Sequence, residues 1–140
     1  MQTDYKITYT TTVNAPIEKV WDALINPEIV KLYFFGTELI ADWAVGNDII
    51  FKGEWEGEQY QDKGKILTFL PNKKLSYSYF SNFGGMEDKP ENYLWVCYQV
   101  IAEGNQTGLT IQQSNYNQEK ADNSAAGWAA IIDGLKKIVE

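Results

Sequence analysis

The segment Ser124–Glu140, SAAGWAAIIDGLKKIVE, decides the fold of this chain. Its apolar residues recur at the i, i+3, i+4 and i+7 spacing of a helix with one apolar face, and we expect its cap within 122–124. At about 1.5 Å per residue, such a helix spans about 25 Å, which is enough to cross a β-sheet. Gly127 and Gly134 lie inside it, although each glycine costs an exposed helix about 1 kcal/mol relative to alanine.

The two glycines share one edge of this predicted helix. At 100° per residue, Gly127 and Gly134 fall about 20° apart, beside the apolar arc and away from the charged side that carries Asp133 and Lys137. We therefore expect a strand, a loop or a bound molecule to approach the helix backbone there, with Trp128 filling the space beside it.

The N-terminal part of the chain predicts one strand followed by two short helices. Residues 5–13 are β-branched and aromatic, as in a strand. The stretch 14–27, NAPIEKVWDALINP, has Pro16 in its first turn and an apolar stripe at helical spacing. A second helix is expected over 27–34, with one apolar face formed by Ile29, Leu32 and Tyr33.

The middle of the chain predicts an antiparallel sheet. Short β-type runs are separated by turn residues and by no stretch long enough for a crossover helix. With the first strand they give six or seven strands in an α+β fold, and we expect one domain over residues 1–140. The expected strand runs are 37–43, 49–60, 64–70, 74–80, 93–102 and 108–116.

Composition excludes several classes of chemistry. The 140 residues contain no histidine, which removes Ser-His-Asp and Cys-His mechanisms and histidine metal ligands. With Cys97 as the single cysteine, a structural zinc site and an internal disulfide are not expected, and the thiol is interpreted as a small buried apolar group. We expect no cofactor and no metal.

Charge and hydropathy bear on partners and location. The net charge is −7 and all 12 basic residues are lysines, so binding to a nucleic-acid backbone is not expected. No apolar run reaches the roughly 20 residues of a membrane span and no signal peptide is visible, which predicts a cytoplasmic protein, monomeric or homodimeric. Glu54, Glu56 and Glu58 alternate in one expected strand, where they are interpreted as a solvated face.

The order of motifs resembles the START-like (SRPBCC) superfamily. The matching stretches run through nearly the whole chain: NAPIEKVWDAL from residue 14, DIIFKG after Gly46, GKILTFLPNKKLSYSY from Gly64, TGLTIQQS from Thr107 and GWAAIIDGLKKIVE from Gly127. Within it, the likeness is to the group related to the C-terminal domain of the activator of heat-shock-protein-90 ATPase. The resemblance implies a helix-grip fold, in which a curved antiparallel sheet wraps around a long C-terminal helix.

Two features depart from that group. Gly108 stands where the strand motif often has a basic residue. Eukaryotic activators also carry a separate N-terminal chaperone-binding domain, whereas here residue 5 already begins the expected fold. The resemblance alone therefore does not carry the activator function to this chain.

The resemblance also implies a cavity between the sheet and the last helix. Superfamily members commonly hold apolar molecules there, so large rings and apolar residues of the sheet and helices are the candidates for its lining. The loop 81–92 is long for a hairpin and is interpreted either as a lid, with Phe83 and Met86 as its apolar contacts, or as a solvated loop. The candidate lining residues are Trp128, Ile131, Leu135, Gly127, Trp43, Phe51, Trp55, Tyr79, Trp95, Tyr33 and Phe83.

Three functions remain open from the sequence. The first is a non-enzymatic domain that binds a small apolar ligand in this cavity. The second is a stress-related or chaperone-associated interaction module. The third is a cyclase-like or hydrolase-like enzyme that uses a buried carboxylate. The spacing of Asp and Glu nominates no residue for this role, and Asp22 and Asp42 are candidates only through their closeness to candidate aromatics.

Overall fold

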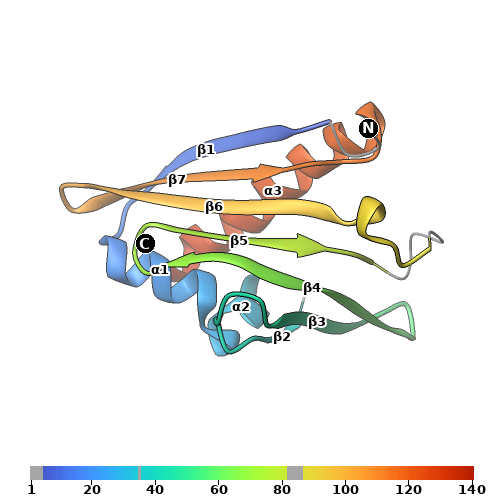
Figure 1. Ribbon diagram of the computed structural model, residues 1–140. Coiled ribbons are helices and arrows are strands. Elements are labelled where there is room, and N and C mark those ends of the chain that lie inside the picture. The colour runs from blue at the N-terminus through green and yellow to red at the C-terminus, as the bar shows by residue number, and fades with distance from the viewer. Residues whose placement is uncertain (1–4, 35, 82–86) are drawn as a thin grey trace.

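The computed structural model describes residues 5–34, 36–81 and 87–140, which build a curved antiparallel sheet of seven strands. The strands are ordered β1-β7-β6-β5-β4-β3-β2, so β1 and β2 form the edges (Figure 1). Their bounds are β1 Ile7–Val13, β2 Glu38–Ile40, β3 Asp48–Trp55, β4 Glu58–Leu70, β5 Lys74–Tyr79, β6 Leu94–Glu103 and β7 Gln106–Gln113. This arrangement confirms the α+β, helix-grip class expected from the sequence.

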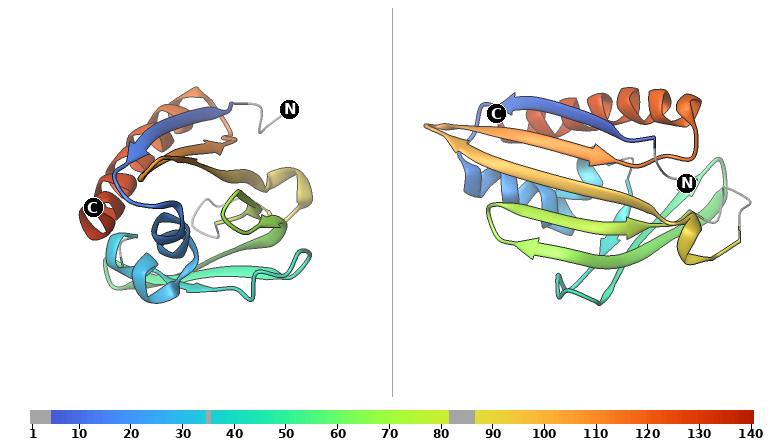
Figure 2. Two further views of the ribbon diagram at one scale, coloured as in Figure 1. Left: turned by 90° about the vertical axis from the view of Figure 1, so that its left-hand side faces the viewer. Right: turned by 45° about the horizontal axis from the view of Figure 1, so that its top comes forward.

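Helices α1 (Ile17–Ile25), α2 (Pro27–Tyr33) and α3 (Gln118–Val139) lie within the curve of the sheet. Figure 2 shows the sheet curling around them, with α3 running along the side of β1 and β7. A 3₁₀ turn, η2 (Pro90–Asn92), precedes β6. Asn26 separates α1 from α2 because its side chain accepts a hydrogen bond from the Glu28 amide at 3.0 Å.

The last helix is longer than the sequence predicted. α3 has 22 residues, and Asn117 caps it by accepting a hydrogen bond from the Lys120 amide at 2.8 Å. The expectation of a cap within 122–124 was wrong because the first turn is almost wholly polar and shows no apolar period. Ala121 is the first residue of α3 to be buried.

The expected apolar face of α2 was wrong at one position. Leu32 is 68% exposed, whereas Val30 is buried in the core. Ile29 and Tyr33 do pack against the core. In a helix of only seven residues, the rotation about the helix axis depends on the neighbouring elements. For α2, these neighbours include β2 and α3.

The expected run 49–60 is a hairpin and not one strand. Glu56 and Gly57 have φ angles of 51° and 82°, as in the two-residue turn that matches the twist of paired strands. Glu54 therefore lies on β3, Glu56 in the turn and Glu58 on β4. Their predicted alignment along one strand is wrong.

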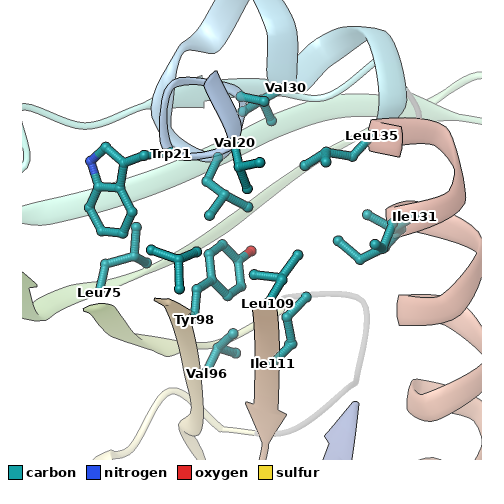
Figure 3. Packing of buried hydrophobic residues seen from close by; sticks show 14 of the residues in the cluster. Val20, Trp21, Val30, Leu75, Val96, Tyr98, Leu109, Ile111, Ile131 and Leu135 are labelled. Atoms are coloured by element: carbon teal, nitrogen blue, oxygen red, sulfur yellow. The ribbon is translucent and has the colours of Figure 1, made fainter. Parts of the chain in front are cut away.

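Side chains from every layer meet in one hydrophobic cluster. Val20 and Trp21 from α1, Leu109 from β7 and Leu135 from α3 are buried there, and Figure 3 shows them converging with Val96, Tyr98 and Ile111 of the sheet. Cys97 is also buried, at 1% exposure, and burial raises the pKa of its thiol. The interpretation of Cys97 as a small buried residue is therefore confirmed.

Candidate ligand-binding groove

A groove of about 320 Å³ lies between the N-terminal half of α3 and the concave face of the sheet. Its volume is at the lower end of the range for small-molecule sites, about 300 to 1,000 Å³. The apolar part of its lining comes from α3, the sheet and the end of α2: Trp128, Ile131, Gly127, Phe34, Tyr77, Tyr79 and Val96. The polar part gathers at the start of α3 and the end of β7: Gln113, Asn115, Lys120, Asn123 and Ser124.

Two structural periods bring this lining together. Trp128 and Ile131 are three residues apart on α3 and so lie on one face of the helix. Tyr77 and Tyr79 are two residues apart on β5 and so point to the same side of the sheet. Val96, which pairs with Tyr77 across β5 and β6, points there as well.

The two glycines of α3 have different surroundings. A Cβ on Gly127 would have nothing within 4 Å, so this glycine leaves open space at the groove. A Cβ on Gly134 would lie 3.1 Å from the Cβ of Tyr33, so this glycine lets α2 pack against α3. The expected close approach at the glycine edge is thus present at Gly134, where the approaching segment is a helix.

Trp128 is held in place by its polar edge as well as by its ring. Its indole N–H donates to the side-chain oxygen of Gln113 on β7 at 2.6 Å. Its ring makes edge contacts with Phe34 at 6.0 Å and Tyr98 at 5.6 Å between centroids. A tryptophan fixed by both kinds of contact forms a rigid wall for the groove.

Behind the tyrosines of β5 lies a buried carboxylate. Asp62 on β4 is 8% exposed, and its Oδ2 accepts a hydrogen bond from the Tyr79 hydroxyl. Burial raises the pKa of Asp62, and hydrogen bonds from Tyr79 and Ser81 oppose that rise. Burial likewise raises the pKa of Tyr79, so its hydroxyl keeps its proton at neutral pH.

A second hydroxyl pair lies deeper in the fold. The Tyr77 and Tyr98 hydroxyl oxygens are 3.1 Å apart, and burial raises the pKa of both side chains. Both remain neutral at physiological pH. Among the described lining residues none carries a carboxylate, and Asp62 is connected to the groove through its hydrogen bond with Tyr79.

Four of the predicted lining residues pack in or against the core cluster and do not line this groove. Leu135 is fully buried in the core cluster. Tyr33, Trp43 and Phe51 surround a void of about 10 Å³, which has room for about one water at most. Their rings contact other rings: Trp43 stacks on Phe69 at 5.4 Å and Phe51 meets Tyr79 edge-on at 5.7 Å.

Of the remaining predicted lining residues, one lies on the opposite face of the sheet and the others have side chains outside the described part of the structure. Trp95 is on the side of β6 opposite to Val96 and Tyr98, and the Lys6 Nζ lies 5.3 Å from its ring centre. It does not line the groove, because alternation along β6 turns it outward. The side chain of Trp55, and Phe83 and Met86 with the centre of the expected lid, lie outside the described residues.

Several groove residues were not predicted. Tyr77 could have been found, because it shares the face of Tyr79 two positions away. No sequence pattern singled out Phe34 or Val96 as lining residues. Part of the polar rim was missed because the start of α3 was placed too late, which left Lys120 in an expected loop. Asn115 fell in the expected strand run 108–116, and Asn123 was only a candidate helix cap.

Larger hollows lie on the outer face of the sheet. One of about 610 Å³ is bounded by charged side chains of β3 and β4, including the Lys65–Asp48 ion pair and the Lys63–Asp88 ion pair at 2.5 Å. Its lining also contains Ile50, Pro90 and Tyr93, and it lies on the opposite side of the sheet from α3. Within the described ranges, no group of three or more His, Cys, Asp or Glu residues is placed to hold a metal ion.

No helix among the described residues is long and apolar enough to cross a membrane.

Comparison with known structures gives matches over almost the whole chain. The structure of ChR145 from Cytophaga hutchinsonii is 43% identical, with a TM-score of 0.85 over 99% of this chain and 95% of that one. Protein MLL2253 from Mesorhizobium loti is 20% identical, with a TM-score of 0.76 over 94% of each chain. The Aha1 dimer from Colwellia psychrerythraea is 20% identical, with a TM-score of 0.74 over 96% of each chain.

The family assignment rests on sequence. No curated protein matches the chain. Residues 14–140, which include every helix and all of the sheet except β1, match the family described as Activator of Hsp90 ATPase homolog 1-like protein. The START-like resemblance is thereby confirmed, and the chain belongs to the Activator of Hsp90 ATPase homolog 1-like family.

Proposed function

We propose that this protein is a binding domain, without catalytic activity of its own, that takes one small and largely apolar molecule into the groove beside α3. The observation that supports the proposal is the partly apolar hollow of about 320 Å³ next to Gly127, where the helix backbone has open space in front of it. Trp128 and Ile131 from the helix and Tyr77 and Tyr79 from the sheet offer the apolar surface.

The polar rim defines the orientation of such a ligand. Lys120 and Asn123 are exposed at the start of α3, whereas Trp128 is 6% exposed within the groove. An amphipathic molecule would bury its apolar body against the rings and keep its polar surface at the rim, because unpaired polar groups are costly to bury.

The test is a ligand screen on a matched pair of variants. Thermal-shift assays and native mass spectrometry with fatty acids, aromatic acids, indoles and aromatic amines are expected to give a ligand that stabilises the protein. Gly127→Leu places a side chain into the groove and should abolish that shift without unfolding the protein. Ala130→Leu adds the same side chain at an exposed position of the same helix and should leave the shift unchanged.

Two outcomes would count against this function. If no compound in the screen raises the melting temperature or stays bound in native mass spectrometry, the groove is not a ligand site. If both leucine variants keep the full shift, the ligand binds elsewhere.

A second candidate, a chaperone-associated interaction module, is favoured by the family to which the chain belongs. Its test is an ATPase assay with heat-shock protein 90 and the purified protein. Stimulation would support this function, and an unchanged rate at saturating protein would remove it. The oligomeric state, monomer or homodimer, is measured in the same preparation by light scattering.

A further inference from the structure

Asp62 is a buried acid without a lysine partner, and it accepts hydrogen bonds from Tyr79 and Ser81. It is 8% exposed, and its Oδ1 is inaccessible and has no hydrogen-bond partner among the described residues. The chain's 12 lysines all lie in the described ranges, and none of them forms an ion pair with Asp62. An unpaired carboxylate in this position is costly, and such a cost is usually retained at a functional site.

Tyr79 connects this carboxylate to the groove. The Tyr79 hydroxyl donates its hydrogen to Asp62 Oδ2, and the Tyr79 side chain lines the groove. Because the proton of the hydroxyl is committed to Asp62, its oxygen offers lone pairs to a ligand and not a donor. The hydrogen bond to an ionised group also makes that oxygen a stronger acceptor.

The surroundings of Tyr79 are suited to a cation. Its ring meets Phe51, and Tyr77 and Trp128 supply further aromatic surface in the same groove. Aromatic faces attract ammonium groups, and a positive charge near Tyr79 would also compensate the charge of Asp62. The one lysine of the lining, Lys120, is exposed, so solvent and salt screen its repulsion.

We infer that Tyr79 is the polar anchor of the groove, that Asp62 is the positioning residue that makes it an acceptor, and that the ligand class is an apolar or aromatic molecule carrying a protonated amine. This inference rests on the proposed function, since it concerns the same groove. It assigns no reaction to the pair: Asp62 acts on the ligand through Tyr79 and through its charge.

The test compares three probes that share an indole body and differ at the end of a short side chain: tryptamine, tryptophol and indole-3-acetate. Affinities are measured by isothermal titration at pH 8 and low salt. The wild-type protein is expected to bind tryptamine at least tenfold more tightly than tryptophol and to bind indole-3-acetate most weakly.

Variants separate the roles of the two residues. Asp62→Asn keeps the shape and is expected to reduce the tryptamine preference to less than threefold while leaving tryptophol affinity unchanged. Tyr79→Phe removes the acceptor and should weaken both probes. Asp48→Asn is the matched control, because it removes one carboxylate charge on the outer face of β3 and should keep the tenfold preference.

The outcomes are distinguishable from failure of the proposed function. Equal binding of tryptamine and tryptophol, or tightest binding of indole-3-acetate, overturns the amine anchor and leaves the apolar groove as a site. If Asp62→Asn and Asp48→Asn reduce the tryptamine preference equally, the preference reflects net charge alone. This result also overturns the amine anchor. If none of the probes binds, the inference fails, and the wider ligand screen decides separately whether the groove binds anything. Thermal melts of each variant establish that it is folded.

Discussion

Gly134 of α3 lies against Tyr33 of α2 so closely that a Cβ added to the glycine would be 3.1 Å from the Cβ of the tyrosine. Tyr33 has little freedom to withdraw, because its hydroxyl donates to the Ala23 carbonyl at 2.6 Å and its backbone ends α2. This contact explains why a long helix keeps one glycine with a poor helix propensity. It does not explain Gly127, which faces open space.

The first prediction concerns these two glycines as a pair. Gly127→Ala should stabilise the protein by about 0.5 to 1 kcal/mol, because alanine improves helix propensity and meets nothing. Gly134→Ala gains the same propensity but must displace Tyr33, so it should be neutral or destabilising. Urea denaturation measures the free energy of unfolding of both variants. Equal stabilisation by the two substitutions would contradict the prediction, because it would mean that Tyr33 and α2 move away from the added methyl group at little cost.

The second prediction concerns the pairing of β4 with β5. A Cβ on Gly64 would lie 1.6 Å from the carbonyl oxygen of Ser78, a backbone atom that cannot move without breaking the strand pairing. Gly64→Ala should therefore cost more than about 3 kcal/mol or prevent folding. Gly108→Ala is the control in β7, because its Cβ would meet a flexible Glu103 side chain at 3.3 Å, and its cost should be below about 1 kcal/mol. Similar melting temperatures for the two variants would contradict this.

The third prediction concerns pH. Burial raises the folded-state pKa of Asp62 above its unfolded value, so between those two values the folded protein binds more protons than the unfolded chain. The contribution of Asp62 to stability therefore falls as pH rises through this window, and the penalty remains at neutral pH. Asp62→Asn should be at least as stable as the wild type at pH 7, and its relative advantage should shrink as the pH is lowered through the window. Denaturation curves for both proteins measure this difference, and a constant gap across the range would argue against a raised pKa.

The fourth prediction concerns the hydrogen bond that fixes Trp128. Trp128→Phe removes the indole N–H and leaves the Gln113 oxygen without this donor, which should cost about 1 to 3 kcal/mol together with the lost ring volume. Trp128→Phe combined with Gln113→Leu should recover part of the loss, because the Gln113 oxygen that has lost its donor is then removed as well. A double-mutant cycle by thermal denaturation gives the coupling, and a coupling near zero would mean that the hydrogen bond contributes nothing to stability.

Local sequence patterns were enough to predict the order of the helices and strands, and the order of motifs was enough to indicate the family. Periods of two and 3.6 residues, turn residues and helix caps are local properties, and they correctly gave a first strand, two short helices, an antiparallel sheet and a long last helix. They also placed Gly127 and Gly134 together at one edge of the apolar arc. They failed where local pattern is ambiguous, as in the turn at Glu56 and Gly57 inside an apparently continuous strand.

The tertiary structure alone decided which of the apolar and aromatic residues line a hollow and which fill the core. Trp43, Phe51 and Leu135 are as apolar as Trp128 and Ile131, but the first three pack only in or against the core, whereas the other two also border the groove. It also brought Asp62 behind Tyr79 through the pairing of neighbouring strands, which no spacing along the chain encodes. Packing between distant segments set these outcomes, because whether a side chain is covered depends on what the opposite layer places in front of it.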